Sequence, residues 1–297
     1  MTQKIAQSAP KDQTLKSGLY LVATPIGNMR DISFRALDVL SSVDTIACED
    51  TRITGKLLSA YRIKKPMVQY NDHSAAKQRS RILQELAAGG RVALVSDAGT
   101  PLISDPGYKL VREVREQGFE VTAVPGANAV LTALQLSGLP SDAFSFIGFL
   151  PAKSTARKKT LEAWAAAPGS LVMYETAPRL EESLADMLAV LGNRQAGVAR
   201  ELTKMFEEVQ SGSLEDLVKH YRKKGAPKGE IVVIVGSEAT IATSDEEEKA
   251  KAVTIEDQLR IALKTMSVKD AAEAVAIASG KPKKTIYTLA LKLSGKS

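Results

Sequence analysis

The hydrophobic pattern of the first 125 residues alternates between short apolar runs and longer stretches with helical periodicity. The short runs are rich in valine, isoleucine and leucine and end at turn residues, which is typical of buried strands. The predicted strands lie at 18–26, 44–48, 66–70, 91–96 and 119–124. The longer stretches place their apolar residues on one helical face. The predicted helices lie at 31–43, 51–61, 74–90 and 105–117.

The last of these helices has a clear start and stop in the sequence. Asp105 precedes Pro106, a pair typical of an N-cap followed by proline in the first helical turn. Asp105 is therefore predicted to cap this helix, and Gly118 is expected to stop it. Strands that alternate with helices favour a largely parallel sheet covered by helices.

A turn and a helix of small residues over 125–142 separate this unit from a second one with the same alternation. The second unit has predicted strands at 144–149, 170–175, 197–202 and 230–236, and predicted helices near 154–167, 178–191 and 213–224. The sequence therefore predicts two α/β domains after a disordered N-terminal tail. The predicted bounds are 1–17 for the tail, 18–125 for the first domain and 126–237 for the second.

The pattern changes after the second unit. Residues 238–253 are polar, charged and without period, which predicts a linker. Three short helical patterns follow within 254–297 and resemble a helix-turn-helix arrangement with a basic last helix. Capping residues and a glycine mark the first two patterns: Thr254, Asp257, Ser267, Asp270 and Gly280. This appendage could contact nucleic-acid phosphates, or it could be a small bundle for packing or dimer contact.

Length and composition limit the class of protein. A chain of 297 residues is long enough for two domains, and 44% hydrophobic residues are enough to bury a core. No apolar run approaches the roughly 20 residues that a membrane helix needs. The polar N-terminus has no apolar segment of the kind found in signal peptides. We therefore expect a cytoplasmic protein without a membrane partner.

The numbers of cysteines and histidines and the net charge limit which bonds, metal sites and partners the chain can have. Cys48 is the only cysteine, so no internal disulfide forms, and Glu49 and Asp50 behind it disfavour a thiolate. His73 and His220 are the only histidines, so no zinc cluster is predicted, although an all-carboxylate magnesium site stays open. The net charge of +6 fits either a polyanionic partner or a slightly basic surface.

Glycine and proline mark five loops that directly follow predicted strands. In open α/β sheets, ligands bind outside the carboxyl ends of the strands. Glycine lets the backbone approach a ligand closely, and proline holds the loop shape. Each loop alone is also an ordinary turn sequence, but together they predict a ligand cleft between the two domains. The loops are 24–28, 96–107, 125–129, 174–179 and 200–204.

These loops do not match the common nucleotide sites. The segment SDAGTPLISDPG (96–107) has no lysine of the P-loop kind, and ATPIGNMRD (23–31) lacks the GxGxxG pattern of dinucleotide sites. A cofactor without phosphates remains, and S-adenosylmethionine is the commonest of these.

Seven segments resemble the tetrapyrrole methylase superfamily, and within it the branch that methylates small-subunit ribosomal RNA. They are, in order, LYLVATPIGNMRDIS, ACEDTR, ALVSDAGTPLISDPG, VPGANA, YETAPR, ARELTKMFEE and GEIVVIVG. The resemblance spans about residues 18–237. The segment QYNDHS (69–74) departs from the histidine- and asparagine-rich version of this branch, which leaves the role of His73 open.

The resemblance implies two α/β domains of the tetrapyrrole-methylase type, S-adenosylmethionine in the cleft between them, and a homodimer. It implies methyl transfer to the ribose 2′-hydroxyl of a cytidine in the decoding region of 16S rRNA, with the assembled or nearly assembled small ribosomal subunit as substrate. The cofactor contacts that it implies are Pro25, Asp97, Ala98, Gly99, Thr100, Ile103, Asn128, Ala129, Glu175, Leu202 and Glu230.

The catalytic candidates follow the second predicted strand. A ribose hydroxyl is a weak acid, so a general base would assist the transfer. Glu49 and Asp50 are predicted to lie at the cofactor edge of the sheet, with Arg52 as a phosphate clamp. The alternative is that these acidic residues cap the next helix. Asp97 and His73 are further possible bases.

Four basic residues are candidate RNA contacts: Arg30, Arg179, Arg200 and Lys204. For Arg200 and Lys204 the alternative is an exposed ion-pair network with neighbouring glutamates. Aromatic residues make up only 5% of the chain, so recognition is expected to depend on the shape and the phosphate charge of folded RNA.

Two other functions remain open at this point. A tetrapyrrole methyltransferase of the same superfamily would more usually carry Gly-Asp-Pro where this chain has Gly99, Thr100 and Pro101. A non-enzymatic RNA-binding assembly factor that retains the fold would bind no cofactor.

Overall fold

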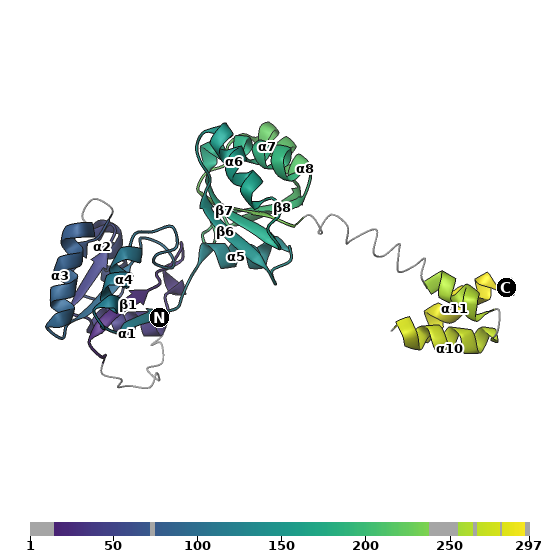
Figure 1. Cartoon of the computed structure of the whole chain (residues 1–297), viewed down its shortest axis with the longest axis horizontal. Coiled ribbons are helices and arrows are strands. Elements are labelled where there is room, and N and C mark those ends of the chain that lie inside the picture. The colour runs from purple at the N-terminus through teal and green to yellow at the C-terminus, as the bar shows by residue number, and fades with distance from the viewer. Residues whose placement is uncertain (1–14, 72–74, 238–254, 264–265, 280, 295–297) are drawn as a thin grey trace, which may run out of the picture. The chain divides into compact units, whose positions relative to one another are not determined.

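The computed structural model describes residues 15–71, 75–237, 255–263, 266–279 and 281–294. These residues form two units, which divide between Val235 and Gly236 (Figure 1). Several sequence predictions lie outside the described residues: most of the tail, the linker, the role of His73, the cap at Thr254 and the stop at Gly280.

The first five strands form a parallel sheet in the order β3-β2-β4-β1-β5. The strands are β1 (Gly18–Val22), β2 (Thr45–Cys48), β3 (Met67–Gln69), β4 (Arg91–Val95) and β5 (Val121–Val124). The helices between them are η1 (Met29–Asp31), α1 (Phe34–Ser42), α2 (Thr51–Ala60), α3 (Ala75–Ala87) and α4 (Tyr108–Glu116). The predicted parallel, helix-covered sheet is confirmed, with most elements a few residues shorter than predicted.

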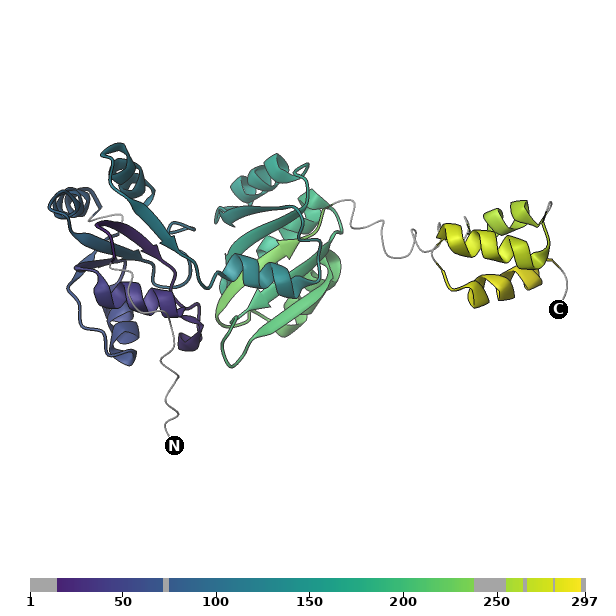
Figure 2. The same ribbon diagram turned by 90° about the horizontal axis from the view of Figure 1, so that it is seen from below.

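Both faces of this sheet are buried. Successive strand residues point to opposite faces, so Val22 and Val95 pack with α1 and α2, while Leu19 and Leu94 pack with α3 and α4. Figure 2 shows the two pairs of helices on opposite sides of the sheet. Burial on both faces explains why these strands read as continuous apolar runs.

The predicted start of α4 is wrong. The helix begins at Tyr108 behind Gly107, whose φ is 141°, and no side chain caps it. Asp105 lies in the preceding loop, where its carboxyl group accepts a hydrogen bond from Ser96. The loop turns through left-handed conformations at Leu102 (φ 72°) and Ser104 (φ 65°), which keep Asp105 out of the cap position.

The other five strands form a mixed sheet in the order β6-β7-β10-β8-β9. Only β6 and β7 run parallel, and the other neighbours are antiparallel. The strands are β6 (Phe144–Phe149), β7 (Ser170–Thr176), β8 (Gln195–Arg200), β9 (Glu208–Ser213) and β10 (Glu230–Val235). The helices are α5 (Ala129–Ser137), α6 (Ser154–Trp164), η2 (Ala177–Arg179), α7 (Leu180–Leu191) and α8 (Leu214–Lys224). The sequence did not predict β9, a polar and half-buried edge strand without an apolar run.

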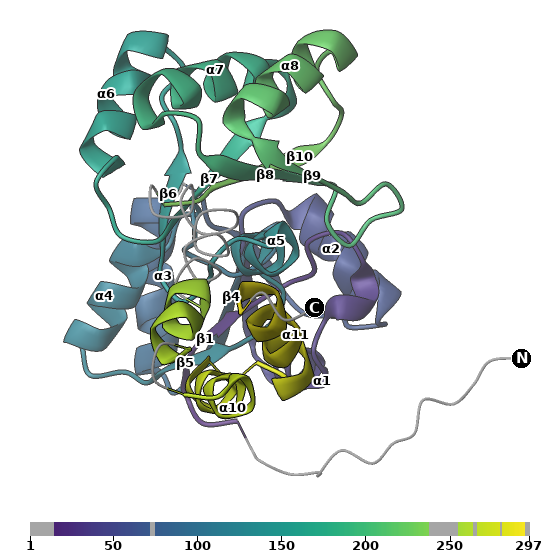
Figure 3. The same ribbon diagram turned by 90° about the vertical axis from the view of Figure 1, so that its right-hand side faces the viewer.

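Helices cover both faces of the mixed sheet. Helices α6, α7 and α8 pack on one face around Met173 and Val233, and α5 packs on the other around Val172 and Val232. Figures 1 and 3 show α6, α7 and α8 together on one side of the strands and α5 on the opposite side. Asn128 caps α5 by accepting a hydrogen bond from the Leu131 amide, so the end of β5 leads directly into this second layer.

Substitution of Gly169 by alanine is expected to destabilise the mixed sheet by about 3 kcal/mol. Gly169 precedes β7 with a φ of 78°, and an added Cβ would lie 2.0 Å from the Ala143 carbonyl oxygen. The shift of either backbone would break the Ser170 amide hydrogen bond to the same oxygen. Urea unfolding of the full chain measures the change.

Gly118→Ala is the matched control for this prediction. Gly118 has a φ of 80°, and an added Cβ would meet nothing within 4 Å. The Gly118→Ala variant is destabilised only by the left-handed backbone conformation, which costs alanine about 1–2 kcal/mol. Equal losses of stability in the two variants would contradict the close packing at Gly169.

The unit that follows Val235 is a small helical bundle. It consists of a helix over 255–262, α10 (Val268–Ser279) and α11 (Lys283–Leu293), seen packed together in Figure 2. Their core is formed by Leu259, Ala272, Val275, Ala276, Ile286 and Ala290. The predicted cap of α10 is confirmed, because the Asp270 amide donates to the Ser267 hydroxyl at 3.2 Å.

Candidate functional site

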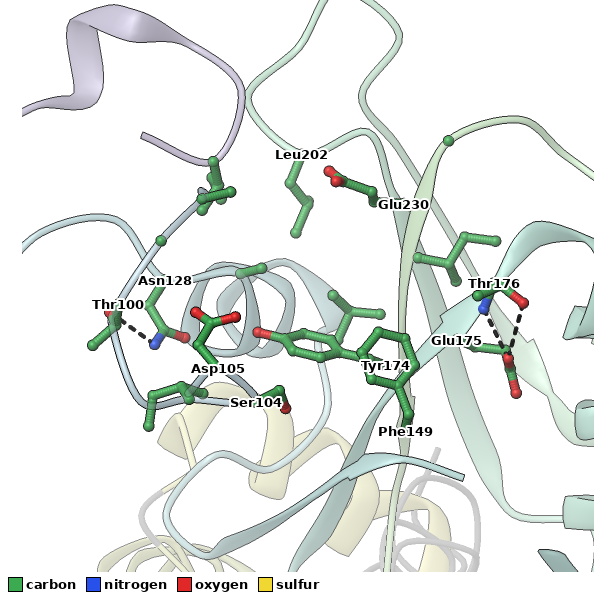
Figure 4. Close-up of a pocket in the computed structure, with 18 of the residues that line it drawn as sticks. Thr100, Ser104, Asp105, Asn128, Phe149, Tyr174, Glu175, Thr176, Leu202 and Glu230 are labelled. Atoms are coloured by element: carbon green, nitrogen blue, oxygen red, sulfur yellow. Dashed lines mark hydrogen bonds between the residues drawn. The ribbon is translucent and has the colours of Figure 1, made fainter. Parts of the chain in front are cut away.

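A cavity of about 420 Å³ lies where the ends of the two sheets meet, a size typical of small-molecule sites. In the first sheet, β4, β1 and β5 are neighbours, so the loops that leave their carboxyl ends gather at one edge. In the second sheet, Glu230 at the start of β10 pairs with Thr176 at the end of β7. The lining comes from both sheets (Figure 4): Ile26, Ala98–Thr100, Ile103–Asp105, Asn128, Ala129, Phe149, Tyr174–Pro178, Leu202 and Gly229–Val232.

The 96–107 loop is fixed to the segments beside it. Thr24 and Gly99 exchange two backbone hydrogen bonds, of 2.9 and 3.1 Å. The Thr100 hydroxyl donates to the Ala127 carbonyl at 3.2 Å and accepts from the Asn128 side-chain amide at 3.1 Å. Gly99 has a φ of 82°, a conformation that favours glycine. The shape of the cavity wall is therefore set by the protein's own hydrogen bonds.

The sequence prediction placed most of its cofactor contacts around this cavity. All of the predicted residues line it except Pro25 and Asp97. The Asp97 carboxylate instead accepts the Asp50 amide at 3.0 Å and so ties the end of β4 to the start of α2.

Glu175 and Glu230 line the cavity with carboxylates that already have partners. Glu175 is 3% exposed, accepts the Thr176 amide at 2.7 Å and the Ser183 hydroxyl, and lies 3.4 Å from the Arg179 guanidinium. Its carboxylate points away from Asp105 and Tyr174 in Figure 4. Glu230 pairs with Lys204 at 2.9 Å. Both glutamates therefore help to hold the second sheet's side of the cavity.

Sequence reasoning missed two ionisable residues in the wall, Asp105 and Tyr174. Burial and then the charge of Glu49 raise the pKa of Asp105 to about 6. Burial and then the charge of Asp105 raise the pKa of the Tyr174 hydroxyl above its usual value. Both residues lie inside segments that carried the family resemblance, but periodicity assigned Asp105 to a helix cap and Tyr174 to a strand.

The catalytic candidates lie beside the cavity rather than in its wall. Asp50 caps α2 by accepting the Arg52 amide at 2.8 Å, and its carboxylate pairs with the Arg52 guanidinium at 2.6 Å. These hydrogen bonds lower the pKa of Asp50 to about 2. The capping alternative is thus observed for Asp50. Glu49 borders a small hollow behind the 96–107 loop that Asp105 also lines.

Three of the four candidate RNA contacts have partners within the chain. Arg179 donates to the Leu150 carbonyl at 2.7 Å, and Arg200 donates to Glu208 at 2.6 Å. Lys204 pairs with Glu201 and Glu230, each at 2.9 Å. Arg30 is exposed.

The described part of the chain contains neither a helix suited to span a membrane nor a cluster of metal-binding side chains. Across these residues, no helix combines the length and apolar character that would let it cross a bilayer. The same residues contain no group of three histidine, cysteine, aspartate or glutamate side chains placed to hold a metal ion.

Two family models match the sequence. The model described as "Tetrapyrrole (Corrin/Porphyrin) Methylases" matches residues 18–218, and the one described as "RsmI C-terminal HTH domain" matches residues 249–294. The chain therefore belongs to the tetrapyrrole methylase family, which confirms the predicted fold class and the predicted enzyme class.

The similar curated proteins narrow this to one branch of the family. The chain is 44% identical over 99% of its length to a protein of Mesorhizobium japonicum, covering 98% of that protein. It is 50% identical to one of Erythrobacter litoralis (95% of this chain, 97% of the relative) and 43% identical to one of Escherichia coli O157:H7 (97% and 99%). All three are named ribosomal RNA small subunit methyltransferase I.

Solved structures share the fold. Diphthine synthase has a TM-score of 0.59 at 16% identity, over 74% of this chain and 90% of that one. Uroporphyrin-III C-methyltransferase from Thermus thermophilus, complexed with S-adenosylhomocysteine, has a TM-score of 0.52 at 18% identity, over 76% and 99%.

The cavity fits the S-adenosylmethionine that this methyltransferase family uses. Apolar side chains such as Leu202 and Val232 suit a nucleoside, and the pinned backbone around Gly99 suits a ligand held by main-chain groups. The carboxylate of Glu230 suits the positive charge of an ammonium group. The predicted cofactor is confirmed, while its individual contacts stay predictions.

Proposed function

We propose that this chain methylates the ribose 2′-hydroxyl of a cytidine in the decoding region of 16S rRNA, in the assembled small subunit. The observation that carries the proposal is the similarity, over nearly the whole chain, to relatives named ribosomal RNA small subunit methyltransferase I. The choice of the ribose oxygen and of a cytidine follows from the family resemblance of the motifs in 18–237.

The cavity supports this proposal through positioning. The cofactor supplies a methyl group already activated on a sulfonium, so the protein's main task is to align the accepting oxygen with it. Thr100 and Asn128 hold the loop against α5, and Thr24 fixes the same loop to the end of β1. Such a preformed wall contributes by holding the two reactants in line before the transfer begins.

We further propose that the protein acts as a cytoplasmic homodimer and reaches RNA with exposed basic residues. Arg30 and Arg52 are exposed on the first domain, with Arg52 in an ion pair that phosphate could compete for. In the helical unit, Lys281, Lys283 and Lys284 are exposed near the start of α11 and suit phosphate contacts.

The competing small-molecule function has weaker support. The structural neighbours named uroporphyrin-III-C-methyltransferase and cobalt precorrin-4 methyltransferase are 19% and 16% identical to this chain, which shows a shared fold alone. The first relatives by sequence, at 40–52% identity, carry the ribosomal RNA name instead. The loop also has Thr100 where a tetrapyrrole enzyme more usually has aspartate.

Mapping the methyl group tests the proposed target. Small subunits from cells that lack the native methylation are incubated with the protein and labelled S-adenosylmethionine, and the rRNA is digested. A 2′-O-methylated nucleotide resists alkaline cleavage at its 3′ side, so the expected product is a labelled dinucleotide that begins with cytidine. Label on a base, or on a ribose outside the decoding region, would contradict the proposal.

A further inference from the structure

Among the described residues, one carboxyl group in the cavity wall has no ion pair with a lysine or an arginine. Four lining residues carry ionisable side chains: Asp105, Tyr174, Glu175 and Glu230. The carboxylates of Glu175 and Glu230 are paired with Arg179 and Lys204. The raised pKa of Tyr174 keeps its hydroxyl protonated at neutral pH.

Asp105 differs from the two glutamates in its surroundings. The groups that act on its carboxyl are the Ser96 hydroxyl and two further carboxylates, Glu49 from the end of β2 and Asp97 from the same loop. From the opposite side of the cavity, the Tyr174 ring of β7 directs its hydroxyl toward Asp105 (Figure 4). Among the described residues, no lysine or arginine contributes to the electrostatics of this carboxyl.

The position of Asp105 is built into the loop. Left-handed turns at Leu102 and Ser104 and a φ of 141° at Gly107 delay the start of α4 until Tyr108. An added Cβ at Gly107 would lie 3.0 Å from the Leu94 side chain, so the loop packs closely on β4. An ordinary helix start would have used Asp105 as a cap, and this loop instead presents it to the cavity.

We propose that the Asp105 carboxylate accepts the proton of the attacking hydroxyl during methyl transfer, a role that rests on the proposed function. The hydroxyl oxygen forms a bond to the methyl carbon while the carbon–sulfur bond breaks and its electron pair stays on sulfur. The hydroxyl proton passes to an Asp105 oxygen and then to solvent. The protonated Tyr174 hydroxyl donates toward the same region and orients the acceptor oxygen.

The electrostatics of the site suit this role at neutral pH. Burial and the negative charges of Glu49 and Asp97 raise the pKa of Asp105, and the hydrogen bond from Ser96 lowers it. The net result is a pKa of about 6. A carboxylate with this pKa is deprotonated at pH 7 yet is a stronger base than an ordinary aspartate. The rate should therefore rise with pH through about 6 and then level off.

The test measures kcat/KM on small subunits from pH 5 to 8 for the wild type, Asp105→Asn, Asp105→Glu and the exposed control Asp142→Asn. For Asp105→Asn, kcat/KM is expected to fall about 100- to 10,000-fold and to show no rise near pH 6. Asp105→Glu is expected to recover part of the lost kcat/KM. Asp142→Asn is expected to match the wild type. Carbon-13 NMR of aspartate carboxyl groups should show a titration near pH 6 that Asp105→Asn lacks.

Cofactor affinity, measured by calorimetry, separates the outcomes. The proposal expects Asp105→Asn to bind S-adenosylmethionine with nearly the wild-type Kd. A rate and a pH profile like those of the wild type in Asp105→Asn would overturn it, and so would a lost cofactor affinity that accounts for the whole defect. No transfer to subunits by the wild type would contradict the proposed function itself and remove this role with it.

Discussion

Replacing Ala129 with phenylalanine is expected to weaken S-adenosylmethionine binding by at least about tenfold, or 1.4 kcal/mol, while the fold stays intact. Ala129 is the first residue of α5, is half-buried and lines the cavity. A phenyl ring at this position would occupy space that the cofactor needs. Isothermal titration calorimetry with the purified chain measures the change in Kd.

Leu131→Phe provides the matched control. Leu131 lies two residues further along the same helix, is 48% exposed and does not line the cavity. Its replacement adds an aromatic ring to α5 without filling the site, so the Kd should stay at the wild-type value. Wild-type affinity in Ala129→Phe would mean that the cofactor binds elsewhere.

Replacing Arg157 with methionine is expected to destabilise the protein by about 3–5 kcal/mol. The Arg157 side chain is 1% exposed and pairs with Asp186 at 2.7 Å, which joins α6 to α7 over the core of the mixed sheet. Methionine keeps part of the volume but leaves the buried Asp186 without this partner. Urea unfolding at pH 7 measures the loss.

The loss of stability caused by Arg157→Met should become smaller at low pH. Burial raises the pKa of Asp186, but hydrogen bonds from Arg157 and Ser154 outweigh it, so the pKa is lowered in the folded wild type. The ion pair therefore stabilises the wild type above the usual aspartate pKa and ceases to do so as the pH falls through the lowered one. Arg112→Met is the control, because its exposed pair with Glu116 contributes little. A similar loss in both variants would contradict the buried pair.

The sequence predicted the strands and helices of the first domain because its buried strands read as apolar runs. It missed β9, since this polar edge strand pairs through its backbone and lacks alternating apolar side chains. It misplaced the start of α4, because the left-handed turns at Leu102 and Ser104 depend on packing against β4 and on the neighbouring loops. Local cap chemistry at Asp105 was a reasonable expectation that tertiary contacts overrode.

The candidate site could be predicted in outline for a topological reason. Loops that follow parallel strands gather at one edge of the sheet, so the sequence alone predicts that residues such as Thr100 and Asn128 lie close together. The chemical state of each side chain was beyond sequence reasoning. Whether Asp105 lies near other carboxylates depends on its contact with Glu49, which is far away in the chain. Whether Asp50 caps α2 or faces the cavity depends on how its side chain is oriented in the fold.

The most direct test of the central claim compares methyl acceptors. The full chain and labelled S-adenosylmethionine are given small ribosomal subunits without native methylation, the same rRNA as naked RNA, or uroporphyrinogen III. Our account predicts label in the rRNA of the subunits, with less in naked rRNA and none in the tetrapyrrole. Label in the tetrapyrrole alone, or no transfer to RNA by protein that binds the cofactor, would contradict it.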